Sequence, residues 1–108
     1  MSMSVYYNPE ELGLEQVAEI DYASPDDYGF DYRVIWWHAE NRKLYTGRDY
    51  GCSCPSPFEE FFALEDLDEL PDMTALREEA RREGPKQNTP EQIQTFLHAV
   101  EIVLRRTK

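Results

Sequence analysis

The chain has 108 residues and carries 22 acidic side chains against 11 basic ones, a formal net charge of −11 at pH 7. A surface of that sign repels phosphate backbones, which argues against direct binding to nucleic acid. The length suits a single small domain, and an aromatic content of 13% excludes a disordered chain.

Neither a membrane segment nor a secretion signal is expected. No apolar run approaches the roughly 20 residues that cross a bilayer. The amino terminus, MSMSVYYNPEE, lacks both a basic and an apolar segment. We therefore expect a chain that stays in a cytoplasm, contacts no membrane and needs no cofactor. Such a charge is typical of a monomer or a small homo-oligomer.

The first half of the chain predicts an amino-terminal arm followed by three strands. Residues 1–13 form the arm, in which Pro9 at the first position of a helical turn and Gly13 as its stop predict one short turn. The turn chemistry of residues 23–27 and 40–42 separates the strands that follow. We expect these strands over 14–22, 30–38 and 43–49.

The second strand is the clearest of the three predictions. By the period of two, Val34 and Trp36 share one face with Phe30, Tyr32 and His38. The opposite face begins with Asp31 and Arg33 and turns apolar at Ile35 and Trp37. We therefore expect a layer of structure over that end of the second face as well.

The second half predicts helices after an irregular loop. Residues 51–57, GCSCPSP, cannot form regular structure. Ser56 as a cap and Pro57 as the first residue predict a helix that carries Phe58, Phe61 and Phe62 on one face. A short turn over residues 64–70 and a helical piece around Met73–Ala80 follow. The capping box of Thr89–Gln92 opens a last helix, whose apolar stripe is Ile93, Phe96, Leu97, Val100, Val103 and Leu104.

These patterns predict one α+β domain, a three-stranded antiparallel meander followed by three or four helices. The carboxyl-terminal helix is expected to pack on the sheet. Its parts are the arm at 1–13, the sheet at 14–50, the Cys/Pro loop at 51–57 and the helical part at 58–108.

The acidic side chains are concentrated in two blocks. Residues 1–32 and residues 49–76 each contain eight acids and no base. The second block predicts a surface for a basic protein partner, although a merely solvated face accounts for it too. The acids proposed for this surface are Glu60, Glu65, Asp66, Asp68, Glu69 and Asp72.

Aromatic residues of the hairpin are the second candidate for a protein-binding surface. Trp and Tyr dominate the energetics of protein interfaces, which singles out Trp37, Tyr45 and Tyr50. Of the two tryptophans, Trp37 is expected to be the exposed one. The alternative is that helices cover both faces of the sheet and bury these rings.

Cys52 and Cys54 are the candidate metal ligands, with His38 and Asp49 as completions of a tetrahedral set. The alternatives are a strained disulfide or two buried thiols that pack under the loop. His38 also has a simpler interpretation as a strand-end histidine with an ordinary hydrogen bond. We find no nucleophile elbow and no phosphate-binding glycine loop, so an enzyme is not expected.

The run from Tyr45 to Glu59, with its GCSCPxPFE signature, resembles a family of small proteins encoded by actinobacterial phages and their hosts. Residues Tyr6–Pro9 and Leu64–Leu67 extend the resemblance over roughly residues 5–70. It implies a phage or prophage product in a bacterial cytoplasm, which binds and modulates a host or defence protein without catalysis. A small metal-binding domain using Cys52 and Cys54 is one alternative. A structural or virion-associated component that oligomerises through the hairpin is another.

Overall fold

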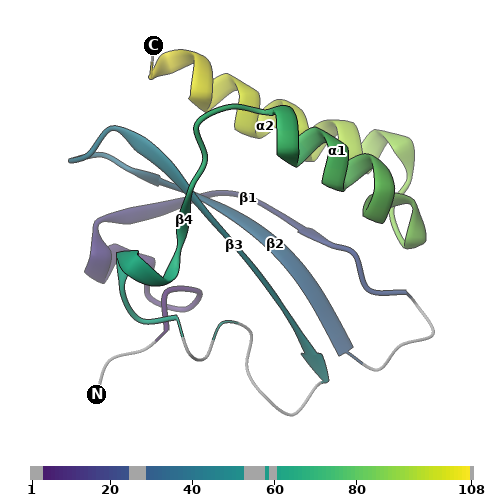
Figure 1. Cartoon of the computed structure of the whole chain (residues 1–108), viewed down its shortest axis with the longest axis horizontal. Helices are drawn as coiled ribbons and strands as arrows, with labels where there is room; N and C mark the ends of the chain where they lie inside the picture. The colour runs from purple at the N-terminus through teal and green to yellow at the C-terminus, as the bar shows by residue number, and fades with distance from the viewer. Residues whose placement is uncertain (1–3, 25–28, 53–57, 59–60, 108) are drawn as a thin grey trace.

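The computed structural model describes residues 4–24, 29–52, 58 and 61–107, without the side chain of Cys52. Within these residues an antiparallel sheet is joined by two α-helices (Figure 1). The strands lie in chain order across the sheet, which runs β1 Leu14–Asp21, β2 Gly29–His38, β3 Lys43–Cys52 and β4 Asp68–Glu69. The helices are α1 Thr74–Glu83 and α2 Pro90–Arg106, with short 3-10 turns η1 Pro9–Leu12, η2 Leu64–Asp66 and η3 Gly84–Lys86.

The α+β class and the packing of the carboxyl-terminal helix on the sheet are confirmed. The prediction of three strands missed β4, because Asp68–Glu69 is too short and too polar to carry a strand pattern. These two residues pair with Tyr45 and Thr46, where the chain returns along β3. Of the expected three or four helices, the described residues contain two α-helices. Neither of them is long and apolar enough to cross a bilayer.

The predicted helix after the Cys/Pro loop is not present in its described residues. Phe58 has φ of 58°, a left-handed conformation that a right-handed helix excludes. The Asp49 carboxylate accepts a hydrogen bond from the Phe58 amide at 2.7 Å, and the Phe58 ring is fully buried. Tertiary anchoring therefore overrides the local helix signal. The predicted cap, Ser56, lies outside the described residues.

One face of the sheet is covered by both helices, which run antiparallel to each other (Figure 1). Ile35 on β2 is fully buried there, together with residues of α1 such as Leu76 and of α2 such as Val100. The apolar stripe predicted for the last helix is therefore the stripe that faces the sheet. Thr89 caps α2 as predicted, since its hydroxyl accepts a bond from the Gln92 amide and the Gln92 side chain returns to Thr89.

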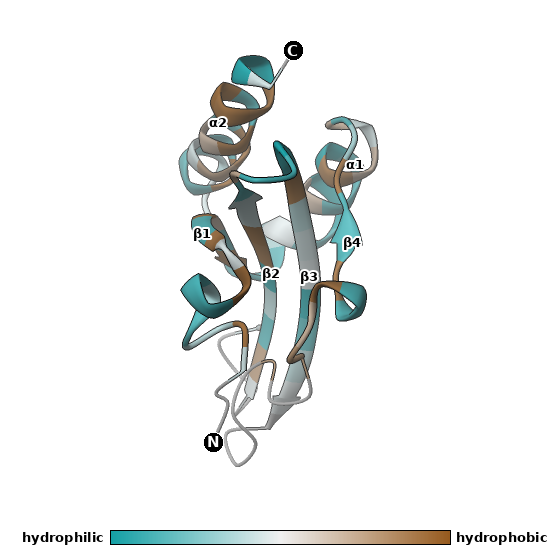
Figure 2. Ribbon diagram, turned by 90° about the vertical axis from the view of Figure 1, so that its left-hand side faces the viewer, coloured by the Kyte–Doolittle hydropathy of each residue, from teal (hydrophilic) through white to brown (hydrophobic). Residues whose placement is uncertain are grey.

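The opposite face is covered by irregular chain rather than by helices. Trp36 is fully buried there, packed edge-on against the ring of Phe58 with ring centroids 5.6 Å apart. The amino-terminal arm contributes Val5, whose amide donates to the carbonyl of Phe61. Gly47 permits this layer to approach β3, because a Cβ at that position would lie 3.1 Å from the Phe58 ring. Figure 2 shows β1 and β4 at the two edges of the sheet.

Ile35 and Ile102 provide a matched test of the helix-covered core. Ile35→Ala removes a side chain with no solvent exposure and is expected to lower the free energy of unfolding by about 2–5 kcal/mol. Ile102→Ala deletes the same atoms from a side chain that is 36% exposed, and should cost under about 1 kcal/mol. Urea unfolding of the two variants measures the difference, and equal costs would contradict this assignment of the core.

Candidate functional site

The three predicted aromatic residues do not share one surface. Trp37 is half-buried and packs against the core under the helices. Tyr45 faces the other side of the sheet, where its hydroxyl accepts a hydrogen bond from the Asn41 side chain. Tyr50 is 77% exposed near the far end of β3. Trp37 lies opposite Leu44, six residues from Tyr50, so roughly 20 Å of strand separates them.

The predicted acids do collect along one edge of the molecule. We name as the acidic edge the exposed side chains that run along η2 and β4 to the start of α1, namely Glu65, Asp66, Asp68, Glu69 and Asp72. The sixth predicted acid, Glu60, lies outside the described residues.

Two carboxylates of the acidic edge accept hydrogen bonds from backbone amides. Asp66 accepts hydrogen bonds from the amides of Phe62 and Ala63 at 2.9 and 3.0 Å. Asp72 accepts from the Thr74 amide at 2.9 Å, at the amino end of α1. These two residues therefore shape the chain as well as contributing charge.

The remaining carboxylates of the acidic edge face solvent. Glu69 pairs with Lys43 at 3.4 Å, and both side chains are about half exposed. Glu65 and Asp68 have no ion-pair partner among the described residues. Arg105 of α2 pairs with Glu101 of its own helix, and it lines a hollow together with Asp72 and Arg77 at the α1 end of the edge. The negative charge of the edge is therefore least compensated at Glu65 and Asp68.

A hollow of about 240 Å³ opens beside the acidic edge. Asp68, Glu69 and Asp72 contribute to its lining, together with the apolar side chains of Leu70 and Leu76. The Arg33–Glu79 ion pair lines the hollow as well. Carboxylates around an apolar wall match the chemistry of a lysine or arginine side chain, which has an aliphatic stem and a charged head.

The candidate metal ligands are only partly described. His38 is buried, and its Nδ1 accepts a hydrogen bond from the Asn41 amide at 3.0 Å. This is the strand-end histidine that the sequence offered as the simpler interpretation. The side chain of Cys52 and all of Cys54 lie outside the described residues. Over the described part of the chain, no three His, Cys, Asp or Glu side chains are grouped to hold a metal ion.

A polar cluster joins the sheet to α1, and sequence reasoning missed it. Arg33 of β2 binds both carboxylate oxygens of Glu79, and Arg48 of β3 binds Asp31 through two hydrogen bonds of 2.8 Å. Arg48 also pairs with Glu83 at 3.1 Å. The available signal was the position of Arg33 on the same strand face as Ile35 and Trp37, the face that the helices bury.

The electrostatics of this cluster favour the ionised form of the Glu79 carboxylate. Burial by itself raises the pKa of Glu79, but the hydrogen bond and the charge of Arg33 outweigh burial, and the pKa lies below its ordinary value. Burial and the neighbouring Glu79 carboxylate raise the pKa of Tyr22, whose hydroxyl donates to Glu79 at 3.0 Å. The hydrogen bonds and ion pairs of this cluster attach α1 to the sheet.

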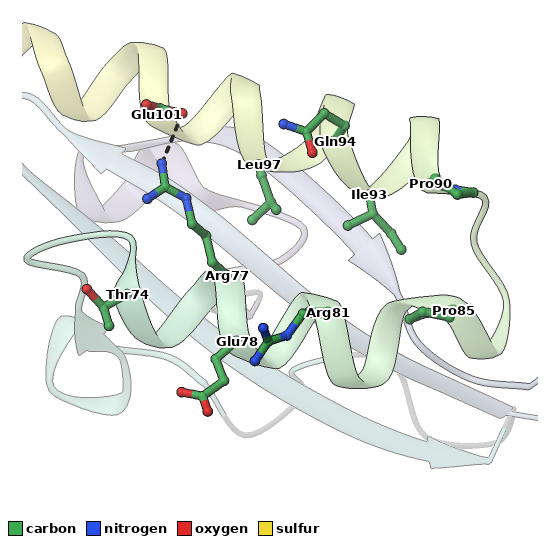
Figure 3. A pocket seen from close by; sticks show the side chains of 10 residues that line it. All are labelled: Thr74, Arg77, Glu78, Arg81, Pro85, Pro90, Ile93, Gln94, Leu97 and Glu101. Carbon is green, nitrogen blue, oxygen red and sulfur yellow. Dashed lines mark ion pairs between the residues drawn. The ribbon is translucent and has the colours of Figure 1, made fainter.

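A groove of about 820 Å³ lies between α1 and α2 (Figure 3). Ile93 and Leu97 supply apolar lining from α2. Arg77 reaches across the groove from α1 and pairs with Glu101 at 3.2 Å, as the dashed line in Figure 3 shows. Arg81 and Glu78 balance each other in charge. The groove therefore has no net charge with which to select a partner.

A family model for a domain of unknown function, DUF7574, matches residues 3–108. The chain belongs to the DUF7574 family. Comparison with curated proteins and with solved structures found no match to the chain. The family description assigns no activity, ligand or partner, so the function has to be argued from the surface of the molecule.

Substitutions of Glu79 and of its neighbour Glu78 test whether the Arg33–Glu79 pair stabilises the fold. Glu79→Gln is expected to lower the free energy of unfolding by about 2 kcal/mol at pH 7, because charged hydrogen bonds to Arg33 are lost. The folded-state pKa of Glu79 is depressed, so its contribution is present above about pH 4.3 and is lost as the pH falls through the folded-state pKa. Urea unfolding of Glu79→Gln and of the wild type should therefore converge in acid. The substitution Glu78→Gln, at an exposed side chain, serves as the control. A loss of unfolding free energy in Glu79→Gln that does not change with pH would contradict a stabilising Arg33–Glu79 pair.

Metal analysis of the purified protein tests the Cys52 and Cys54 alternative. Without a metal site we expect less than one equivalent of zinc per chain. A full equivalent that disappears in Cys52→Ser would instead establish that these thiols bind metal.

Proposed function

We propose that this chain is a non-catalytic binding domain whose acidic edge engages a basic surface of another protein. The observation that carries the proposal is the row of exposed carboxylates from Glu65 to Asp72, which has a single ion-pair partner, Lys43, among the described residues. Uncompensated charge of one sign steers association with a partner of the opposite sign and suppresses wrong partners.

The hollow beside the edge supports a partner with protruding lysine or arginine side chains. Its acids, Asp68, Glu69 and Asp72, would face the charged head, while Leu70 and Leu76 pack against the aliphatic stem. The rigid attachment of α1 by the Arg33–Glu79 pair holds one wall of this hollow in place. That the partner is a host or defence protein of bacteria rests on the resemblance to phage-encoded proteins alone.

The decisive experiment reverses the charges of carboxylates that bind no backbone amide. Asp66 and Asp72 are left unchanged because they bind backbone amides. The test variant changes Glu65, Asp68 and Glu69 to Lys. The control variant changes three exposed acids elsewhere, Glu10, Glu11 and Glu40, to Lys, so that both variants alter the net charge equally.

Each protein is immobilised and exposed to a bacterial host lysate at 50 and 300 mM salt, and the captured proteins are quantified by mass spectrometry. At low salt we expect the wild type and the control variant to retain basic proteins that the test variant does not retain. At high salt we expect the wild type and the control variant to lose these proteins too, because salt screens the charges. Equal capture by all three proteins would defeat the proposal. Thermal unfolding of each variant checks that the fold is intact.

A further inference from the structure

A hollow of about 560 Å³ lies where the last turns of α2 pack against the first half of β1. Its volume falls within the range of roughly 300–1,000 Å³ that is usual for sites that bind small molecules. The hollow lies at the β1 edge of the sheet, whereas the acidic edge lies at β4. The residues that line the hollow determine which ligand it can accept.

The walls of the hollow are apolar. Val17 and Trp37 contribute from the sheet, and Ala99, Ile102 and Val103 contribute from one stripe of α2. Trp37 is half-buried and Ile102 is 36% exposed, so both retain apolar surface that a ligand can cover. A bulky apolar group in the hollow removes this surface from water, which is favourable.

One acidic and one basic residue also line the hollow, Glu15 and Arg106. Glu15 is the register partner of Trp37 on β2, so its side chain lies beside the indole on the helix-covered face of the sheet. Arg106 is in the last turn of α2, on the same stripe as Ala99 and Val103. Both charged side chains are exposed, and neither forms an ion pair with the other or with another described residue. Gln16, the remaining lining residue, adds no charge.

This combination of opposite charges selects among the small molecules that an apolar hollow can accept. An apolar anion such as a fatty acid brings a second negative charge beside Glu15, and an apolar amine brings a second positive charge beside Arg106. Like charges repel each other in both cases. A ligand that carries both signs can place its ammonium group at Glu15 and its carboxylate at Arg106, where each forms a charge-assisted hydrogen bond. Such a ligand gains from both charges.

We propose that this hollow binds a free α-amino acid with a bulky apolar side chain. Its ammonium group pairs with Glu15, its carboxylate pairs with Arg106, and its side chain packs between Trp37 and Ile102. Because Glu15 and Arg106 do not pair directly, the ligand bridges them. The hollow and the acidic edge lie at opposite edges of the sheet, so either proposal can fail without the other.

L-phenylalanine and two analogues test the proposal by NMR titration of the isotope-labelled full-length chain. Phenethylamine lacks the carboxylate and 3-phenylpropionate lacks the ammonium group, while all three ligands share the phenyl ring. The indole N–H of Trp37 donates to no described residue, so its signal reports on occupation of the hollow. We expect L-phenylalanine to bind with a Kd below about 1 mM and each analogue to bind at least about tenfold more weakly.

Substitutions at the two charges assign each group of the ligand to its partner. Arg106→Gln removes the partner of the carboxylate, so L-phenylalanine and phenethylamine should bind this variant alike. Glu15→Gln should likewise make L-phenylalanine and 3-phenylpropionate bind alike, and Ile102→Ser should weaken all three ligands several-fold. The controls Arg81→Gln and Glu91→Gln make the same charge changes at exposed positions elsewhere on the helices, and should stay within about twofold of the wild type.

The proposal is overturned if L-phenylalanine shows no saturable binding up to about 10 mM, or if either analogue binds the wild type equally well. It is also overturned if Arg106→Gln and Glu15→Gln behave like their controls, or if each weakens all three ligands to the same extent. A wild-type dimer that Ile102→Ser converts to a monomer, measured by light scattering, would show that a second copy covers the hollow instead. Thermal unfolding of the variants confirms that a loss of binding does not reflect a loss of fold.

Discussion

Burial of both faces of the β2–β3 hairpin is the constraint on which the rest of this structure depends. Val34 and Trp36 on one face and Ile35 on the other have no solvent exposure, so each face needs its own covering layer. The helices cover one face, and the amino-terminal arm with the chain around Phe58 covers the other. Both flat surfaces of the sheet are thereby used for folding. The acidic edge, which is the proposed binding surface, lies along the β4 edge of the sheet.

The arginines of the hairpin connect the fold to its surface charge. Arg33 and Arg48 point toward α1 and bind Glu79, Glu83 and Asp31 there, in a partly buried cluster. Two cations of a base-poor chain are therefore neutralised by carboxylates at the sheet–helix boundary. As a result, neither arginine forms an ion pair with a carboxylate of the acidic edge. Because the same cluster positions α1, it also positions the stretch of chain that leads into α1 and carries the end of the acidic edge.

Local patterns predicted much of this fold, since they report which residues a strand or helix will bury. The alternation around Trp36 and the capping box at Thr89 were both confirmed. The exposure of the acids along η2 and β4 was also anticipated. The separation of Trp37 from Tyr45 was not anticipated, because it depends on the register in which β2 pairs with β3. Trp37 pairs with Leu44, and Tyr45 pairs with Trp36, so the two rings emerge on opposite faces. Alternation within each strand does not determine how two strands align across a turn.

The amino-acid sequence by itself determined the class of fold, the order of the main strands and the apolar side of α2, because periodicity and capping act over a few neighbouring residues. The tertiary structure alone decided where the segment after the Cys/Pro loop goes. Phe58 follows a strong helix-start signal, yet it is held in a left-handed conformation by Asp49 and by its place over Gly47. It also decided that β4 forms. These outcomes depend on contacts between residues distant in the chain, which no local pattern encodes.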